Sequence, residues 1–448
     1  MGIFKSYDVR GVVPDELDPV LAKRIGFAAA RRIGGRRIAV GRDARGSSPA
    51  LSEALIAGVR AAGIAVVDIG LIDTPGLYFA VGHLDLDGGV MVTASHNPAK
   101  YNGFKICREK AIPLSFETGI GDIEKDVLAM TAEPGKPDAA VETRDILDAY
   151  VNHLASFAKN LRPLKVVCDA GNGMGGMILS RLTKRLPGTF IPLYWEPDCT
   201  FPNHEANPLN PATLKDLQAR VVSEKADLGV AFDGDADRCA FVTRGGEKVS
   251  CDLITALLCQ TLLRESPGSA VVYDLRSSRA VPEEIRKHGG VPVRDRVGHA
   301  HMKATLRRHD GPFGGELSGH YYFKKHFFAD SAMIAFIEVL NVLSATKADL
   351  ADLIRPIQRY HATGEVNFRV TDTVALTEAL AKKYSKGKQD RLDGLTVEFP
   401  DWWFNLRSSN TEPLLRLNLE ANDRATLDRR LAEVLDILGQ PLSGHCPS

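Results

Sequence analysis

Short apolar runs rich in Val and Ile alternate with amphipathic stretches along most of this chain. One cycle runs from an apolar run at residues 37–43, through an amphipathic stretch at 49–63, to a second apolar run at 64–70. Apolar runs bounded by Gly, Asp or Pro are typical of buried strands, and a period of about 3.6 residues indicates helices. Because short helical crossovers join parallel strands, each cycle predicts a strand–helix–strand unit of an α/β fold.

The same cycle occurs twice more along the chain. It begins again at residues 164–173 and 269–278, and it ends at 189–198 and 291–299. Beyond about residue 362 the pattern changes to alternating strands followed by one long amphipathic helix. The 448 residues exceed what one hydrophobic core holds, and about 150 residues per domain gives about three domains. We therefore expect three related α/β units and a terminal α+β module.

Composition and charge narrow the class of protein. Lys plus Arg and Asp plus Glu both number 56, and this zero net charge argues against a nucleic-acid partner. No run approaches about 18 apolar residues, so no membrane-spanning helix is expected, and the first residues lack the apolar core of a signal peptide. The seven cysteines are scattered without a CxxC pair, which disfavours a disulfide framework or a zinc site. A reducing cytoplasm is the expected location.

The first stretch with candidate chemistry follows an apolar strand predicted at residues 89–92. Ser95 lies next to His96, and an Asn-Pro pair directly after them predicts a turn that exposes the hydroxyl. Such a strand end is where α/β sheets place ligands. Ser95 is therefore either a nucleophile or an ordinary turn serine, and the GxSxG elbow of a serine hydrolase is absent. Lys105, ten residues on, is a candidate cation or proton-transfer group.

The second stretch, residues 228–242, places three carboxylates between two apolar runs. Asp233, Asp235 and Asp237 occur at i, i+2 and i+4, a spacing that directs side chains of an extended loop to one side. Three like charges this close repel each other unless a cation neutralises them, and a set of oxygen ligands favours Mg²⁺. An acidic turn in solvent is the alternative, and the flanking apolar runs disfavour it. Arg238 is then available for a phosphate.

The third stretch, residues 313–323, is rich in glycine. Such glycines let backbone approach a ligand closely, and Glu316, Ser318 and His320 lie among them. A Glu and a Ser two residues apart suit the vicinal hydroxyls of a sugar. The alternative is a glycine-rich turn with a core histidine.

The fourth stretch interrupts a strand predicted near the C-terminus. Arg407 is followed by hydroxyl and amide side chains that include Ser409, Asn410 and Thr411. One guanidinium, several hydroxyls and the amides of a turn form a candidate phosphate site. A polar hairpin turn is the alternative, although it would rarely need this combination.

A glycine pattern after the strand predicted at residues 164–169 is the outline of a dinucleotide-binding fingerprint. Gly171, Gly173 and Gly176 have the GxGxxG spacing, and Glu196 ends the next strand. A lone GxGxxG is weak evidence, because a tight strand-to-helix turn needs the same glycines.

The four stretches in this order resemble the α-D-phosphohexomutase superfamily, and the resemblance covers nearly the whole chain. They read TASHNP, DGDADR, GGELSGH and RSSNTEP. The resemblance implies an α/β enzyme that is heart-shaped around a central cleft, with three related α/β domains of mixed sheets and a C-terminal α+β domain. We place these four domains at residues 1–145, 146–245, 246–358 and 359–448.

The resemblance also implies roles for individual residues. Ser95 would be a phosphoserine that donates to the sugar, and it would hold Mg²⁺ together with Asp233, Asp235 and Asp237. The transferring phosphoryl group would be surrounded by Tyr7, Arg10, His96, Lys105 and Arg238. Proton transfer would fall to Arg10, Lys105 or His320. The sugar hydroxyls would be bound by Glu316, Ser318 and His299. The other phosphate would be held by Arg407, Ser409, Asn410 and Thr411.

The implied reaction is reversible phosphoryl transfer between C1 and C6 of a hexose phosphate through a hexose 1,6-bisphosphate. The sequence GELSGH is similar to the sugar loop of phosphomannomutase/phosphoglucomutase enzymes, whereas phosphoglucosamine mutases usually carry Gln where this chain has Leu317. Mannose 6-phosphate and mannose 1-phosphate are the expected pair, with glucose phosphates also accepted. The alternatives are a phosphoglucosamine mutase, a metal-dependent sugar phosphatase, a noncatalytic sugar-phosphate sensor and a nucleotide-binding protein.

Overall fold

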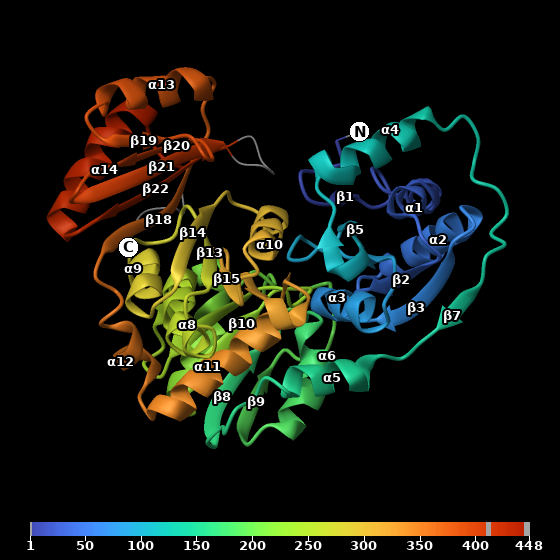
Figure 1. The fold of residues 1–448 in the computed structure, drawn as a ribbon, viewed down its shortest axis with the longest axis horizontal. Helices are drawn as coiled ribbons and strands as arrows, with labels where there is room; N and C mark the ends of the chain where they lie inside the picture. Colours follow the sequence, from blue (N-terminus) through green and yellow to red (C-terminus); the bar gives the residue numbers. More distant parts are fainter. Residues whose placement is uncertain (1, 409–413, 443–448) are drawn as a thin grey trace.

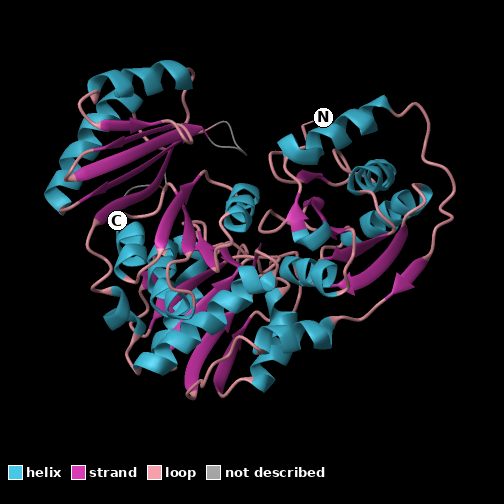
Figure 2. Cartoon of the chain, viewed as in Figure 1, coloured by secondary structure: helices cyan, strands magenta, loops and turns pink. Residues whose placement is uncertain are grey.

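The strands of this protein form four separate sheets, one in each of four consecutive domains (Figures 1 and 2). The structure is a computed structural model that describes residues 2–408 and 414–442. The first sheet has the order β1-β5-β4-β2-β3-β7, and β6 pairs with β5 at one end. Its strands are β1 (Val9–Val12), β2 (Arg37–Arg42), β3 (Ala65–Leu71), β4 (Gly88–Val92), β5 (Tyr101–Arg108), β6 (Ile112–Pro113) and β7 (Val141–Thr143).

The second and third sheets have five strands each. The second has the order β12-β11-β10-β8-β9, and the third has the order β14-β13-β15-β16-β17. The strands of the second are β8 (Leu164–Asp169), β9 (Gly188–Leu193), β10 (Leu228–Phe232), β11 (Cys239–Thr243) and β12 (Lys248–Val249). Those of the third are β13 (Ala270–Asp274), β14 (Val291–Asp295), β15 (Phe313–Gly315), β16 (Tyr321–Phe323) and β17 (Ala329–Asp330).

One four-strand pattern is repeated in the first three sheets. In each copy the first strand lies in the middle, parallel to the second on one side and to the third on the other. The fourth strand then pairs antiparallel with the third. The sets are β2-β3-β4-β5, β8-β9-β10-β11 and β13-β14-β15-β16. The strand order reverses at the first strand, which makes its carboxyl end a topological switch point where ligands bind.

Helices cover the faces of these three sheets, which accounts for the mostly apolar, buried strands at their centres. β4, β10 and β13 are buried along their whole length. The helices are α1 (Pro19–Ile33), α2 (Ser48–Ala61), α3 (Thr74–His83), α4 (Gly121–Ala129), α5 (Leu147–Ala155), α6 (Gly175–Leu182), α7 (Lys215–Ser223), α8 (Cys251–Glu265), α9 (Ala280–Lys287), α10 (His299–Arg308) and α11 (Ala332–Thr346).

The fourth sheet is antiparallel throughout and has the order β18-β22-β21-β20-β19. Its strands are β18 (His361–Phe368), β19 (Lys388–Asp390), β20 (Leu395–Glu398), β21 (Trp402–Ser408) and β22 (Leu415–Ala421). The remaining helices are α12 (Leu350–Ile354), α13 (Thr373–Lys383) and α14 (Arg424–Leu438). Figure 1 shows α13 and α14 with this sheet as a separate lobe, in red. The expectation of three α/β domains and a terminal α+β domain is confirmed.

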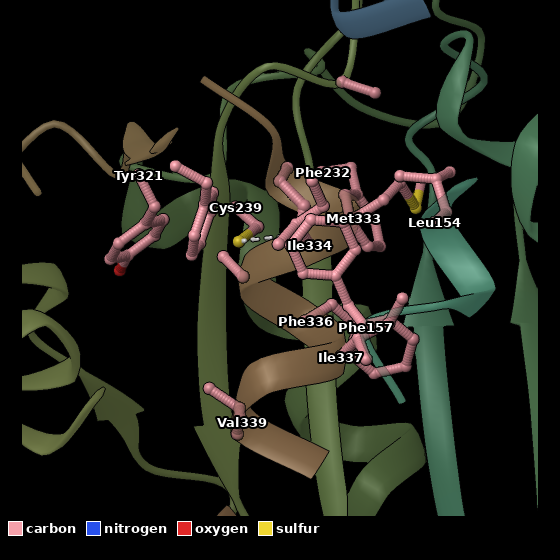
Figure 3. Close-up of a cluster of buried hydrophobic side chains, with 14 of the residues drawn as sticks. Leu154, Phe157, Phe232, Cys239, Tyr321, Met333, Ile334, Phe336, Ile337 and Val339 are labelled. Carbon is pink, nitrogen blue, oxygen red and sulfur yellow. Dashed lines mark hydrogen bonds between the residues drawn. The ribbon is translucent and has the colours of Figure 1, made fainter. Parts of the chain in front are cut away.

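One hydrophobic core joins the first three domains, whereas the fourth domain has a core of its own. Figure 3 shows the centre of the shared core, where Met333 and Phe336 of α11 lie close to Phe232 of β10. Leu154 and Phe157, from α5 and the residues after it, belong to the same cluster. This packing fixes the loops of the first three domains relative to one another. Among the described residues, no helix is long and apolar enough to cross a membrane.

Candidate active site

The three loops with candidate chemistry in the first three domains occupy the same place in the repeated pattern. Each connects the third strand of a copy to its antiparallel fourth strand, at the carboxyl end of the parallel strands. The loops are residues 93–100 between β4 and β5, 233–238 between β10 and β11, and 316–320 between β15 and β16. The repeat thus places a serine, a set of carboxylates and a glycine-rich loop on equivalent edges of three neighbouring sheets.

Ser95 lies in a tight turn and is almost fully buried. Its φ of 50° is in the left-handed region, which costs a residue with a Cβ about 1–2 kcal/mol. The hydroxyl donates to Asp233 Oδ2 at 2.8 Å and lies 3.3 Å from His96 Nδ1. The backbone amide of Ser95 donates to Thr93 Oγ1 at 3.0 Å. The turn therefore directs the Ser95 hydroxyl at the carboxylates of the second domain.

Asp233, Asp235 and Asp237 converge, as the sequence predicts, with one oxygen of each lying within 4.8 Å of the others. The expected reason is wrong, however. The loop is a tight turn with Ala236 at a φ of 56°, and it is not an extended segment with alternating side chains. One carboxylate oxygen of Asp235 and one of Asp237 are buried without a hydrogen-bond partner among the described residues. Buried orphaned carboxylate oxygens in such a cluster fit the ligand set of a hard divalent cation.

Lys105 and Arg238 supply positive charge to this cluster. Lys105 Nζ donates to Asp235 Oδ2 at 2.6 Å and also contacts Asp237, while Arg238 Nη2 donates to Asp233 Oδ2 at 3.0 Å. Burial, reinforced by the charge of Asp237, raises the pKa of Asp233 to about 7. Burial also opposes ionisation of Asp237, but Lys105 and His320 hold its pKa well below the usual value. The three carboxylates therefore face Lys105 and Arg238, with His320 beside Asp237.

His96 lies between Ser95 and Arg238. Arg238 Nη2 donates to His96 Nδ1, so this nitrogen is an acceptor. Burial and the charges of Arg238 and Arg10 hold the pKa of His96 well below its ordinary value. Arg10, on β1, donates from Nη1 to Asn97 Oδ1 at 2.6 Å, two residues beyond Ser95. His96 is thus a neutral group beside Ser95, and Arg10 brings a further positive charge to the same turn.

The glycine-rich loop of the third domain meets the carboxylate loop of the second. Arg238 and His320 form an isolated antiparallel bridge, and His320 Nε2 lies 3.5 Å from Asp237 Oδ1. His320 Nδ1 lies 2.9 Å from Ser318 Oγ. Gly319 has a φ of 82°, and a Cβ there would lie 2.8 Å from the carbonyl oxygen of Cys239, so the close approach of the two loops requires glycine.

Glu316 is buried at the start of this loop. Gly298 N donates to its Oε2 at 3.4 Å, the hydroxyl of Tyr322 also donates to the carboxylate, and Arg276 Nη2 lies 3.6 Å away. Burial raises the pKa of Glu316, and the nearby His320 acts in the opposite direction by lowering it. Tyr322 was not predicted as a site residue. Its position two residues after His320 could have suggested it, since both then share one face of the strand.

Tyr7 and His299 bring the N-terminal segment and α10 to the same place. The hydroxyl of Tyr7 donates to Val297 O at 2.9 Å, and its ring meets that of His299 edge-on with centroids 5.4 Å apart. His299 Nδ1 is buried without a hydrogen-bond partner among the described residues. A cavity of about 410 Å³ opens beside them, and it is lined by parts of the first, third and fourth domains, including Lys5, Tyr7, Glu117, Arg296, His301 and Asp393.

Arg407 lies apart from these loops, in the fourth domain. Its strand, β21, continues through Ser408, so Arg407 is part of the sheet and not of a loop as predicted. Arg407 Nη2 donates to Glu365 Oε2 at 2.8 Å, and Arg276 and Arg416 lie 3.4 and 2.9 Å from the same carboxylate. One carboxylate among three guanidinium groups leaves excess positive charge. Ser409, Asn410 and Thr411 lie outside the described residues.

Thr74, at the start of α3, is a second residue that sequence reasoning missed. Its hydroxyl donates to Asp235 Oδ2, and its backbone amide donates to Asp235 O at 3.1 Å. The preceding Asp73 accepts from Gly76 N at 2.8 Å and caps the helix. The Asp-Thr-Pro sequence is a typical helix start, but nothing in it indicates a contact more than 160 residues away.

The glycines of the candidate dinucleotide fingerprint have packing roles. A Cβ on Gly173 would lie 2.7 Å from Gly234 O, inside the carboxylate loop, and one on Gly176 would lie 1.9 Å from Trp195 O. Gly171 has a φ of 51°. Each glycine therefore answers a steric requirement of the second domain, and the spacing gives no support to nucleotide binding.

Buried carboxylates, clustered cations and a buried serine at the ends of the strands of a rigid α/β scaffold define a site suited to phosphoryl transfer. Comparison with known proteins identifies the family. The three successive phosphoglucomutase/phosphomannomutase alpha/beta/alpha domains I, II and III match residues 1–132, 148–246 and 250–360. The C-terminal domain of the same family matches residues 365–437.

Individual relatives agree over almost their full length. The chain is 44% identical to a protein of Xanthomonas campestris pv. campestris named phosphohexose mutases, with 97% of this chain and 98% of the relative covered. It is 39% identical to a phosphomannomutase of Salmonella montevideo, with 97% and 98% covered. The crystal structure of a phosphoglucomutase/phosphomannomutase family protein from Burkholderia thailandensis superposes with a TM-score of 0.90 at 34% identity, covering 100% and 99% of the two chains.

The chain belongs to the phosphoglucomutase/phosphomannomutase family. The resemblance to the phosphohexomutases and the expectation of a mutase enzyme are thereby confirmed.

Proposed function

We propose that this enzyme moves a phosphoryl group reversibly between C6 and C1 of mannose phosphate, and also of glucose phosphate, with Ser95 as the carrier. One observation carries the proposal: the Ser95 hydroxyl, from the first domain, lies 2.8 Å from Asp233 of the second, inside a cluster of carboxylates and cations. The four domains that we propose, 1–145, 146–245, 246–358 and 359–448, would each contribute one loop to the reaction.

In the first half of the reaction the bond between phosphorus and Ser95 Oγ breaks and a bond to a sugar hydroxyl oxygen forms. The proton of that hydroxyl passes to a base, for which Arg10, Lys105 and His320 are the candidates. Arg10, His96, Lys105, Arg238 and Tyr7 would surround the transferring phosphoryl group. The product of this half is a hexose 1,6-bisphosphate, which also serves as the activator that phosphorylates Ser95.

Mg²⁺ is the cation that we propose for Asp233, Asp235 and Asp237, with an oxygen of phosphorylated Ser95 completing the set. The buried Oδ1 of Asp235, which has no hydrogen-bond partner among the described residues, supports this assignment. When bound, the ion supplies Lewis-acid polarisation and neutralises charge on the phosphoryl group. Lys105 and Arg238 hold the three carboxylates in place before the substrate arrives.

In the second half the bisphosphate turns over, and its other phosphate returns to Ser95. Glu316, Ser318 and His299 would contact the sugar hydroxyls in both orientations. Arg407, with the predicted Ser409, Asn410 and Thr411, would hold whichever phosphate is not reacting. The surplus of guanidinium groups around Glu365 supports an anion site at this end of the cleft.

The proposal is tested with wild-type protein, Mg²⁺ and a trace of glucose 1,6-bisphosphate. Phosphorus NMR should follow conversion of mannose 1-phosphate and glucose 1-phosphate to their 6-phosphates, and intact mass should show one phosphate on the peptide containing Ser95. Release of inorganic phosphate would instead indicate a phosphatase, and binding without phosphorylation would indicate a sensor. Faster conversion of glucosamine 1-phosphate would favour the phosphoglucosamine mutase alternative.

Replacing Arg407 by alanine should weaken substrate binding and slow turnover without preventing phosphorylation of Ser95. Loss of a charge-assisted contact to phosphate costs about 2–3 kcal/mol, or about 30- to 150-fold in kcat/KM. Steady-state kinetics with both 1-phosphates measure this loss. Arg391→Ala is the matched control, since Arg391 is an exposed arginine of the same domain paired with Glu378. Equal kinetics for the Arg407 and Arg391 variants would show that Arg407 does not bind the substrate phosphate.

A further inference from the structure

Arg45 occupies the loop after β2, and its guanidinium lies beneath the turn that carries Ser95. It is 1% exposed. Nη2 donates to the carbonyl oxygens of Ser95 at 2.8 Å and Asn97 at 2.7 Å, and Nη1 donates to those of Pro98 at 2.9 Å and Tyr101 at 3.0 Å. Nε donates to Asp43 Oδ2 at 3.1 Å. All five guanidinium N–H groups therefore have acceptors, three of them in the loop that carries Ser95 and one at the start of β5.

We propose that Arg45 is the positioning residue that keeps Ser95 in its left-handed backbone conformation and so aims the hydroxyl at Asp233. Four carbonyl dipoles that point to one place repel each other unless a donor group with positive charge stands between them. The planar guanidinium can serve four acceptors in different directions, whereas a lysine ammonium has three donors on a single atom. The proposal rests on the proposed role of Ser95 as phosphoryl carrier.

Residues of the second domain pack against both the Arg45 guanidinium and the Ser95 carbonyl. The ring of Phe201 lies against the Arg45 guanidinium, with its centroid 5.4 Å from Cζ. A Cβ on Gly234, in the carboxylate loop, would lie 2.3 Å from the carbonyl oxygen of Ser95. The carbonyl that Arg45 holds is thus the backbone group against which the carboxylate loop packs, so a shift of this carbonyl would change the distance between Ser95 and Asp233.

Comparison of the three repeats shows whether the repeated fold itself needs an arginine at the position of Arg45. In the third domain Arg276 follows Asp274 as Arg45 follows Asp43, and its Nε donates to that carboxylate at the same distance, 3.1 Å. The outer nitrogens of Arg276 contact carboxylates and not a ring of carbonyls: Nη2 donates to Asp274 Oδ2 at 2.9 Å and lies 3.6 Å from Glu316, and Nη1 lies 3.4 Å from Glu365.

The second domain has no arginine at this position. Gly171 follows Asp169 there, and His204 Nε2 lies 3.0 Å from the Asp169 carboxylate instead. The repeated unit therefore folds without an arginine at the end of its first strand. The contacts to four carbonyls belong to the domain that carries Ser95.

The test compares Arg45→Lys with Arg307→Lys. Arg307 is the matched control, because its Nη2 also donates to backbone carbonyls at 2.6–3.2 Å, that of Phe327 in its own domain and those of Lys110 and Ala111 in the first domain. Arg45→Lys should lower kcat about 100-fold with KM within about 3-fold, since a misaimed reacting group affects the chemical step. Arg307→Lys should lower the melting temperature and leave kcat within about 3-fold. Guanidinium ion added at a non-denaturing concentration should partly restore kcat in the Arg45→Ala variant. It should not change kcat in any Arg307 variant.

Amide hydrogen exchange gives a readout that does not depend on catalysis. Residues 95–101 should exchange faster in Arg45→Lys than in the wild type, while these amides stay protected in Arg307→Lys. Normal kcat with unchanged exchange in Arg45→Lys would overturn the proposal, as would equal losses of kcat in the two lysine variants. If Arg45→Lys does not fold, Asp43→Asn, which replaces the carboxylate that accepts from Arg45 Nε, must show the same changes at smaller size. Wild-type protein that carries no phosphoserine after incubation with glucose 1,6-bisphosphate and Mg²⁺ would refute the proposed function and leave the exchange comparison valid.

Discussion

Ser95→Ala is expected to abolish measurable mutase turnover, with a fall of about three orders of magnitude or more. Turnover falls because the variant lacks the proposed carrier oxygen, and without it neither half-reaction has a group to accept or donate phosphate. The hydroxyl lies among Asp233, His96 and Arg238, and no other hydroxyl was found bonded to Asp233 among the described side chains. Alanine accepts the same backbone conformation about as well as serine. Coupled assays with mannose 1-phosphate and glucose 1-phosphate measure the effect.

Ser180→Ala provides the control for this prediction. The Ser180 hydroxyl donates to Met177 O at 2.8 Å within α6, remote from the cluster. Both variants should melt within a few degrees of the wild type, and only Ser95→Ala should lose the added phosphate mass and the turnover. Near-normal turnover in Ser95→Ala would exclude a phosphoserine mechanism.

Asp235→Asn is expected to lower turnover by about 100-fold or more and to weaken its dependence on Mg²⁺. Asparagine keeps the shape but removes a negative charge, and metal-supplied stabilisation of a phosphoryl group is worth several kcal/mol. The buried orphan oxygen of Asp235 makes it a direct candidate ligand, and its other oxygen binds Lys105 and Thr74. Turnover titrated with Mg²⁺ should show both a lower maximum and a higher half-saturating concentration.

Asp349→Asn is the control for the metal prediction. Asp349 caps α12 by accepting from Ala351 N at 2.9 Å, so its substitution costs about 1 kcal/mol of stability or less and leaves the Mg²⁺ titration unchanged. Wild-type turnover that persists after exhaustive chelation would contradict the assignment of Asp233, Asp235 and Asp237 as metal ligands.

The repeated units were predictable because their strands are buried on both faces. The first predicted cycle, 37–43, 49–63 and 64–70, corresponds to β2, α2 and β3 within two residues at each end. The order of strands within each sheet was not predictable, since it depends on which faces pack together and not on local period. Packing of this kind also forms a cluster shared by the first three domains, beside a second cluster within the first domain, and leaves the core of the fourth domain separate.

Some residues of the candidate site could be predicted from local sequence, and others could not because they depend on packing. Asp233, Asp235 and Asp237 were identifiable because three buried like charges have few explanations other than a cation. Lys105 could not be placed, because its position on β5 faces the cluster only through the pairing of β5 with β4. Arg45 and Glu365 escaped notice because each matters through partners roughly 40 to 55 positions away in the chain.

The threefold repeat of one strand order bears on how such an active site can originate. Duplication of a gene segment copies a stable unit together with the hairpin loop between its third and fourth strands. Strand pairing fixes the two ends of each copied loop, and the residues between those ends are not constrained by strand pairing. Mutation can then diversify one loop into a phosphate carrier, one into a cation site and one into a sugar contact while the scaffold is inherited unchanged. Division of labour among repeated segments within a single chain is thus open to a unit that keeps its strand order while its loops differ.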